Sequence, residues 1–109
     1  MATVELTRQT QALLEETLPN EQDIDAKVRQ LIQAEHLREL GRYRRTDLAL
    51  TRKYNLTFDE FTAQHTTRRM GYSWEVEQDA MAWETAVGGI ATMERKLKEL
   101  RELDREQST

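Results

Sequence analysis

The apolar positions of this chain recur mostly at the spacing of a helix. Residues 9–18 carry one apolar face, and Pro19 ends it because a proline pushes the preceding residue out of the helical region. Asn20 or Asp23 can then cap a second helix. The apolar residues of this second helix again follow helical spacing: Ile24, Val28, Leu31 and Ile32.

Gly41 divides the second helical stretch. Glycine in a helix interior costs about 1 kcal/mol relative to alanine. We therefore expect a helix from about 24 to 40 that ends or loosens at Gly41, and a continuation of helix over residues 43–54.

The clearest local signal lies directly after this stretch, in the segment Leu56-Thr57-Phe58-Asp59-Glu60-Phe61. With Thr57 at the N-cap, Glu60 falls at the third helical position and completes a capping box. Leu56 and Phe61 then occupy the two positions of a hydrophobic staple. The segment predicts a short helix that ends before Met70, with residues 65–69 in a loop.

A long C-terminal helix is predicted over residues 73–105, with Ser73 as its cap. Its apolar residues follow a heptad pattern counted from Val76, in which only Asp79 is polar. The two rows of this seam are Val76, Trp83, Ile90 and Leu97, and Asp79, Ala86, Met93 and Leu100. Two adjacent glycines at 88–89 predict either a bend or a close approach by another backbone.

The N-terminal residues 3–7 alternate between polar and apolar, which is the pattern of a half-buried strand. A short strand followed by two helices is also the layout of ribbon-helix-helix DNA-binding dimers. Two features oppose DNA binding by that route, because Glu5 would face the groove and acidic residues occupy the start of the second helix.

The fold expected from these elements is all-α: one small helical domain over residues 1–109. Residues 1–20 form an N-terminal arm that includes the possible strand. The chain is 33% charged and 38% hydrophobic. Because small domains leave much of their surface in water, such a composition favours apolar faces shared with a second copy or a partner. We therefore expect a homo-oligomer or a complex.

The net charge of −4 is unevenly distributed. Residues 1–35 and 55–109 each carry −4, whereas residues 36–54 carry +4. The basic middle offers candidate nucleic-acid contacts. These are Arg42, Arg44, Arg45, Arg52 and Lys53. The alternative is that they pair with the acidic ends of the same chain or form a solvated helix face, which the overall acidity favours.

The residues give no pattern typical of an enzyme, and we expect no catalytic residue, metal or cofactor. The chain contains no cysteine, which excludes disulfides and fits a reducing compartment. Its two histidines, His36 and His65, lie outside metal-ligand spacing, and the glycine pair lacks the lysine of a phosphate loop. No stretch reaches about 18 apolar residues, so none is expected to span a membrane, and residues 1–5 lack the features of a secretory signal.

Two motifs of the chain resemble a group of small bacterial proteins that are described as antitoxin components of toxin–antitoxin pairs. The first is Lys-Tyr-x-Leu/Met-Ser/Thr-x-x-x-Phe, present here at residues 53–61. The second is a Trp-Glu-x-x-x-Asp-x-x-x-Trp-Glu helix, present at residues 74–84. The resemblance covers roughly residues 37–100 and is carried by Tyr54, Phe61, Trp74, Asp79 and Trp83. If these residues form the core of the fold in both cases, shared core contacts would explain the match without a shared function.

The resemblance implies a cytoplasmic, non-enzymatic protein that binds and neutralises a toxin. The long C-terminal helix would then lay its apolar stripe into a groove of that toxin. The residues of this stripe are Trp83, Ile90, Met93, Leu97 and Leu100. One alternative is a structural or adaptor protein that self-associates through the same helix. Another is a DNA-binding transcriptional autoregulator.

Overall fold

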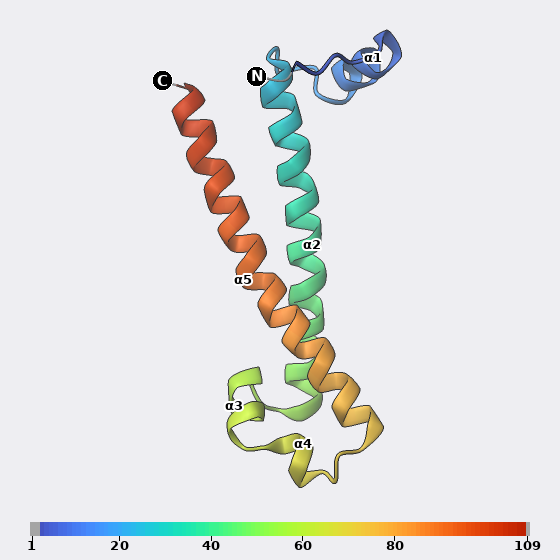
Figure 1. The fold of residues 1–109 in the computed structure, drawn as a ribbon, viewed down its shortest axis with the longest axis vertical. Coiled ribbons are helices and arrows are strands. Elements are labelled where there is room, and N and C mark those ends of the chain that lie inside the picture. The colour runs from blue at the N-terminus through green and yellow to red at the C-terminus, as the bar shows by residue number, and fades with distance from the viewer. Residues whose placement is uncertain (1–2, 109) are drawn as a thin grey trace.

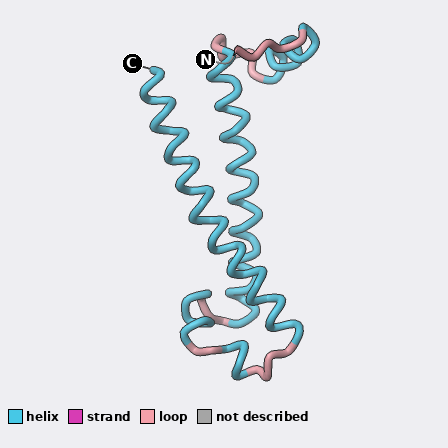
Figure 2. Tube along the Cα trace, in the orientation of Figure 1, coloured by secondary structure: helices cyan, strands magenta, loops and turns pink. Residues whose placement is uncertain are grey.

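Two long antiparallel helices form the body of the protein, and short helices close one end of the pair (Figure 1). The computed structural model describes residues 3–108. Its helices are α1 (Arg8–Thr17), α2 (Ile24–Tyr54), α3 (Phe58–Ala63), α4 (Thr66–Arg69) and α5 (Trp74–Ser108). The molecule measures 58 × 31 × 27 Å. Helices are the only regular elements over residues 3–108, which confirms the all-α class (Figure 2).

The strand expected at residues 3–7 is not formed. A strand needs a neighbouring strand to take up its backbone hydrogen bonds, and residues 3–108 provide none. Thr7 instead caps α1, where its hydroxyl accepts a hydrogen bond from the backbone N–H of Thr10 at 3.2 Å. Within the described residues of one chain, no strand of the ribbon-helix-helix kind is formed.

The second helix is continuous, and the break expected at Gly41 was wrong. The helix extends over 31 residues without interruption. The cost of one glycine is outweighed by contacts on either side of it, because Leu40 is buried against α5 and Tyr43 lies against the same cluster. Asn55 ends α2 in the left-handed conformation, with φ at 54°.

The capping box after α2 is confirmed. The backbone N–H of Thr57 donates to Glu60 Oε1 at 2.8 Å, and the N–H of Glu60 donates to Thr57 Oγ1 at 3.2 Å. The staple residues Leu56 and Phe61 belong to one hydrophobic cluster. The loop expected at residues 65–69 was wrong, since the backbone N–H of Met70 bonds to the carbonyl of Thr66 and closes a turn of helix, α4.

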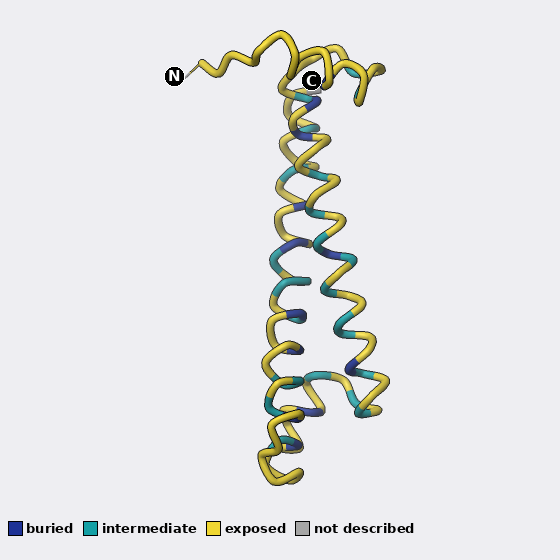
Figure 3. Tube along the Cα trace, turned by 90° about the vertical axis from the view of Figure 1, so that its right-hand side faces the viewer, coloured by how far each residue is buried: buried dark blue, intermediate teal, exposed yellow. Residues whose placement is uncertain are grey.

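The heptad seam of α5 packs against α2 of the same chain. Ser73 caps the helix as predicted, accepting from the N–H of Val76 at 3.3 Å. All eight seam residues, from Val76 to Leu100, are buried or half-buried. Figure 3 shows the buried positions along the facing sides of the two helices. Opposite the seam, α2 contributes a mixed polar and apolar row: Arg29, Leu40, Asp47, Leu50 and Tyr54.

Trp83 is the centre of the core at the closed end. Its side chain is fully buried, and its Nε1 donates to Asp47 Oδ1 of α2 at 2.7 Å. The ring lies 5.1–5.9 Å, centroid to centroid, from three other aromatic rings, those of Tyr54, Phe58 and Phe61. At the open end, Arg29 instead joins the helices through an ion pair with Asp104 at 2.6 Å.

The glycine pair of α5 marks a close approach, but to a side chain and not to a backbone. A Cβ at Gly89 would lie 2.5 Å from the ring of Tyr43, whereas a Cβ at Gly88 would meet nothing within 4 Å. The helix continues through both residues. Gly89 is therefore required by the contact of the two helices, and Gly88 is not.

This difference predicts opposite effects for two neighbouring substitutions. Gly88→Ala should stabilise the protein by about 0.5–1 kcal/mol because alanine reduces the entropy of the unfolded chain. Gly89→Ala should destabilise it by about 1–3 kcal/mol because the Tyr43 ring must move. Urea unfolding followed by circular dichroism measures both effects. In a Tyr43→Ala background the cost of Gly89→Ala should vanish, and an unchanged cost would contradict this contact.

Candidate functional site

The apolar stripe predicted to enter a toxin groove is covered by α2. Three of its residues, Trp83, Met93 and Leu97, are at most 6% exposed. Ile90 and Leu100 are half-buried. A partner could reach this stripe only if α2 and α5 separated. The stripe expected to enter a groove of a toxin is thus occupied by the chain itself, because α2 runs antiparallel along it.

Of the residues that carry the resemblance, Tyr54, Phe61 and Trp83 lie in one core cluster. Asp79, the polar exception in the seam, accepts a hydrogen bond from Tyr54 Oη at 2.5 Å and one from Lys53 Nζ at 2.7 Å. Lys53 also pairs with Glu75 at 2.6 Å. The Lys-Tyr step and the Asp of the second motif therefore meet in one polar network that joins α2 to α5.

The network shifts the proton affinities of its members. Burial by itself would raise the pKa of Asp79, but the hydrogen bonds from Lys53 and Tyr54 outweigh it and hold that pKa below its ordinary value. Burial and the hydrogen bond to Asp79 raise the pKa of Tyr54 to about 12. Hydrogen bonds to Asp79 and Glu75 raise the pKa of Lys53. At neutral pH the arrangement is thus a carboxylate held by an ammonium group and a phenol.

The basic residues of α2 do not form one surface. Arg44 pairs with Glu94 of α5 at 3.0 Å, and Lys53 is held in the network with Asp79. The guanidinium of Arg42 lies 5.1 Å from the ring centroid of Tyr43. Arg45 and Arg52 are exposed. Two of the five candidates therefore pair with acids of the C-terminal region, which weakens the case for a nucleic-acid contact here.

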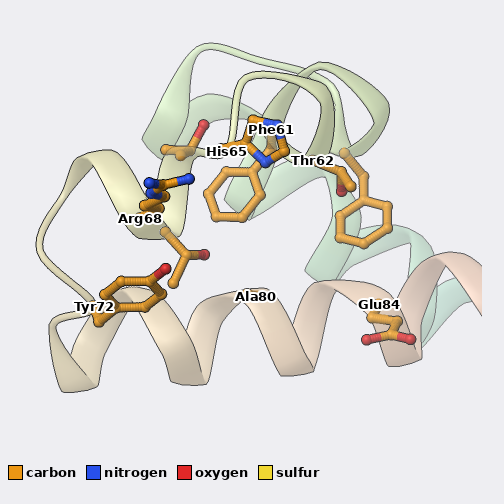
Figure 4. Close-up of a pocket in the computed structure, with 10 residues that line it drawn as sticks. Phe61, Thr62, His65, Arg68, Tyr72, Ala80 and Glu84 are labelled. Carbon is orange, nitrogen blue, oxygen red and sulfur yellow. The ribbon is translucent and has the colours of Figure 1, made fainter.

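A cavity of about 580 Å³ opens at the closed end of the molecule, between α3, α4 and α5 (Figure 4). Phe58, Phe61 and Ala80 give it an apolar side. Its polar lining residues include His65, Arg68, Tyr72 and Glu84. The cavity is open to solvent, and its lining combines apolar and polar side chains.

Trp74 lies outside the core, so shared core contacts do not explain its place in the second motif. Its side chain is 74% exposed. Nine residues separate it from Trp83, so the two indoles lie on opposite sides of α5, as the spacing predicts. Met81, seven residues after Trp74, shares its face and is 70% exposed. Glu77 and Glu84 stand beside this pair on the same helix. We call Trp74, Met81, Glu77 and Glu84 the outer α5 surface.

The apolar row read from the sequence of α2 also points outward. Ile24, Val28, Leu31 and Ile32 are 41–44% exposed. The residues that face α5 instead are Arg29, Leu40, Asp47 and Leu50, a row that hydrophobicity alone does not single out. These residues are 11, 7 and 3 positions apart, separations that return to one helix face, and this was the one signal that could have identified the row.

The polar network makes a pH-dependent contribution to stability. Asp79→Asn should destabilise the protein at pH 7 by roughly 1–3 kcal/mol, because it removes a charged hydrogen-bond acceptor. The pKa of Asp79 is lower in the folded than in the unfolded chain, so its stabilisation is complete above pH of about 4 and is lost as the pH falls through the folded value. Urea unfolding at pH 7 and at acid pH measures this difference. The exposed Glu102→Gln is the control, and an Asp79→Asn effect that is equal at both pH values would refute the network.

Comparison with known proteins gives no match to a family model, a curated protein or a solved structure. Residues 3–108 contain no group of three or more His, Cys, Asp or Glu side chains that could hold a metal ion. None of the helices described is long and apolar enough to cross a membrane.

Proposed function

We propose that this chain is a non-enzymatic, antitoxin-like protein that captures a toxin protein through the outer α5 surface. The observation that carries the proposal is the 74% exposure of Trp74 at the start of α5. Tryptophan is enriched among the residues that dominate binding energy at protein interfaces. Met81 on the same face adds an apolar side chain of a type that is also enriched there.

The charge around these residues indicates the kind of partner. Glu77 and Glu84 border the apolar pair, and the neighbouring Glu75 is held by Lys53. A partner with a basic surface would meet this rim favourably, and the attraction would speed the encounter. The cavity beside Glu84 could receive a side chain of that partner.

This proposal differs in one respect from docking through the inner stripe of α5. That stripe is covered by α2, and exposing Trp83 and Leu97 would sacrifice the core of the hairpin. Binding through Trp74 and Met81 needs no such opening. The antitoxin role itself rests on the resemblance at residues 53–61 and 74–84.

The proposal predicts that Trp74→Ala with Met81→Asp abolishes partner binding without loss of stability. Co-expression with the product of the neighbouring gene, followed by affinity capture and a growth-rescue assay, measures the effect. We expect a loss of affinity of about thirtyfold or more, because a residue that dominates an interface contributes about 2 kcal/mol or more. The melting temperature should stay the same because both side chains are exposed.

Leu103→Asp is the matched control, since Leu103 is an exposed residue of the same helix near the open end. It should bind like the unchanged chain. A chain that neither captures nor neutralises the neighbouring product would overturn the proposed role. Full binding by the Trp74 and Met81 variant would overturn the proposed surface.

A further inference from the structure

The cavity between α3, α4 and α5 is lined by polar side chains that make no hydrogen bond or ion pair within residues 3–108. They comprise three threonines, a histidine, an arginine, a tyrosine and a glutamate. The polar residues between α2 and α5 instead pair with one another, as Lys53 does with Asp79. The polar groups around the cavity are therefore available to a ligand.

Thr66 is the most buried of these residues. It is 6% exposed, and its Oγ1 has no hydrogen-bond partner. Buried polar groups nearly always have a partner in folded proteins, from the protein itself, from water or from a bound ion. An unsatisfied hydroxyl in the lining of a cavity therefore points to a ligand with a polar group at this place.

The backbone on either side of α4 is strained. His65 and Tyr72 adopt left-handed conformations, with φ at 51° and 54°, although neither is a glycine. Both residues line the cavity. Strained backbone of this kind is concentrated at ligand-binding and active sites. The strain thus lies in the same segment as the unsatisfied Thr66 hydroxyl.

The size and the apolar side of the cavity suit a small organic molecule. Its volume of about 580 Å³ lies within the range of roughly 300–1,000 Å³ that is usual for small-molecule sites. Phe58, Phe61 and Ala80 form the apolar side. The ring of Phe61 is held in the core, 5.1 Å from the Trp83 ring, centroid to centroid. Two phenyl rings at this side favour an aromatic ligand.

The charged groups indicate the charge of the ligand and its direction. Arg68 has no carboxylate partner among the described residues, and an unpaired guanidinium binds a carboxylate or a phosphate well. Arg68 and Tyr72 lie at the α4 end of the cavity, and Glu84 lies at the far end (Figure 4). At about 1.5 Å per residue, Trp74 and Glu84 are roughly 15 Å apart along α5. Glu84 therefore opposes an anionic group at its own end more than at the end of Arg68.

We propose that this cavity binds a small molecule that carries an aromatic ring and one anionic group, a carboxylate or a phosphate monoester. The ring lies against Phe58 and Phe61. The anionic group accepts hydrogen bonds from Arg68 and from threonine hydroxyls at the α4 end. The site uses neither Trp74 nor Met81, so it is separate from the toxin capture proposed for the outer α5 surface.

Titration of the full chain with phenyl phosphate and with phenylacetate, followed by ¹H–¹⁵N NMR, tests the site. The backbone amides of residues 62–72 and 80 should shift in a saturable way. The dissociation constant should be about 1 mM or lower, an ordinary value for ligands of about ten heavy atoms. Inorganic phosphate lacks the ring and benzylamine has the opposite charge, so each should bind about tenfold more weakly or less.

Binding of either probe with this preference supports the proposal, and the tighter of the two identifies the anionic group. A chain that binds neither probe, or that binds inorganic phosphate or benzylamine equally well, would overturn it.

Two neighbouring arginines provide a matched pair of variants. Arg68→Gln should weaken binding about tenfold or more because it removes a charge-assisted hydrogen bond. Arg69 is also exposed, but its Nη1 donates to Gln64 Oε1 at 3.1 Å, and it does not line the cavity. Arg69→Gln should bind like the unchanged chain, and circular dichroism should show that both variants keep their helices. Equal affinities of the two variants would refute the role of Arg68. No partner protein is needed in these measurements, so their outcome is independent of toxin capture.

Discussion

The buried indole of Trp83 determines how the two long helices and the short α3 meet. Its ring fills the space between Tyr54, Phe58 and Phe61, and its N–H is satisfied by Asp47 across the interface. Removing a tryptophan of this kind typically costs about 3–5 kcal/mol, a large part of the stability of a small domain. The same contact orients α5, so that the opposite side of the helix turns outward. The position of α3, the cavity beside it and the exposure of Trp74 all follow from this one side chain.

Polar groups along the interface of α2 and α5 determine the register in which the two helices pack. Asp47, Asp79 and Arg29 each find a specific partner on the facing helix. Apolar side chains alone would tolerate a shift of one helix by a turn along the other. The paired polar groups would not, because the shift would leave them without hydrogen-bond partners inside the interface. Gly89 acts in the same way, because it admits the ring of Tyr43 at one level only. The polar residues and the glycine at this interface, which hydrophobicity alone does not single out, thus determine which residues of α2 and α5 meet.

The sequence was most informative where structure depends on near neighbours. The capping box at Thr57 and Glu60, the Ser73 cap and the seam of α5 could all be predicted, because each is encoded within a few residues. The orientation of α2 could not be predicted, since its most apolar row at Ile24, Val28 and Leu31 faces outward and a partly polar row faces α5. The candidate site was displaced for the same reason. The inner stripe of α5 is apolar, but only the fold reveals that α2 covers it and that Trp74 is left exposed.

The two tryptophans therefore differ in their surroundings: Trp83 is buried between the helices, and Trp74 is exposed on the opposite side of α5, where we propose that a partner binds. Exchange of the two indole N–H protons, followed by NMR and assigned with Trp74→Phe, tests this division most directly. The Trp83 proton should exchange only when the whole chain unfolds, because it is buried and bonded to Asp47, whereas the Trp74 proton should exchange at once. Rapid exchange of both protons would contradict the anchoring role of Trp83. Protection of both would contradict the exposed surface on α5.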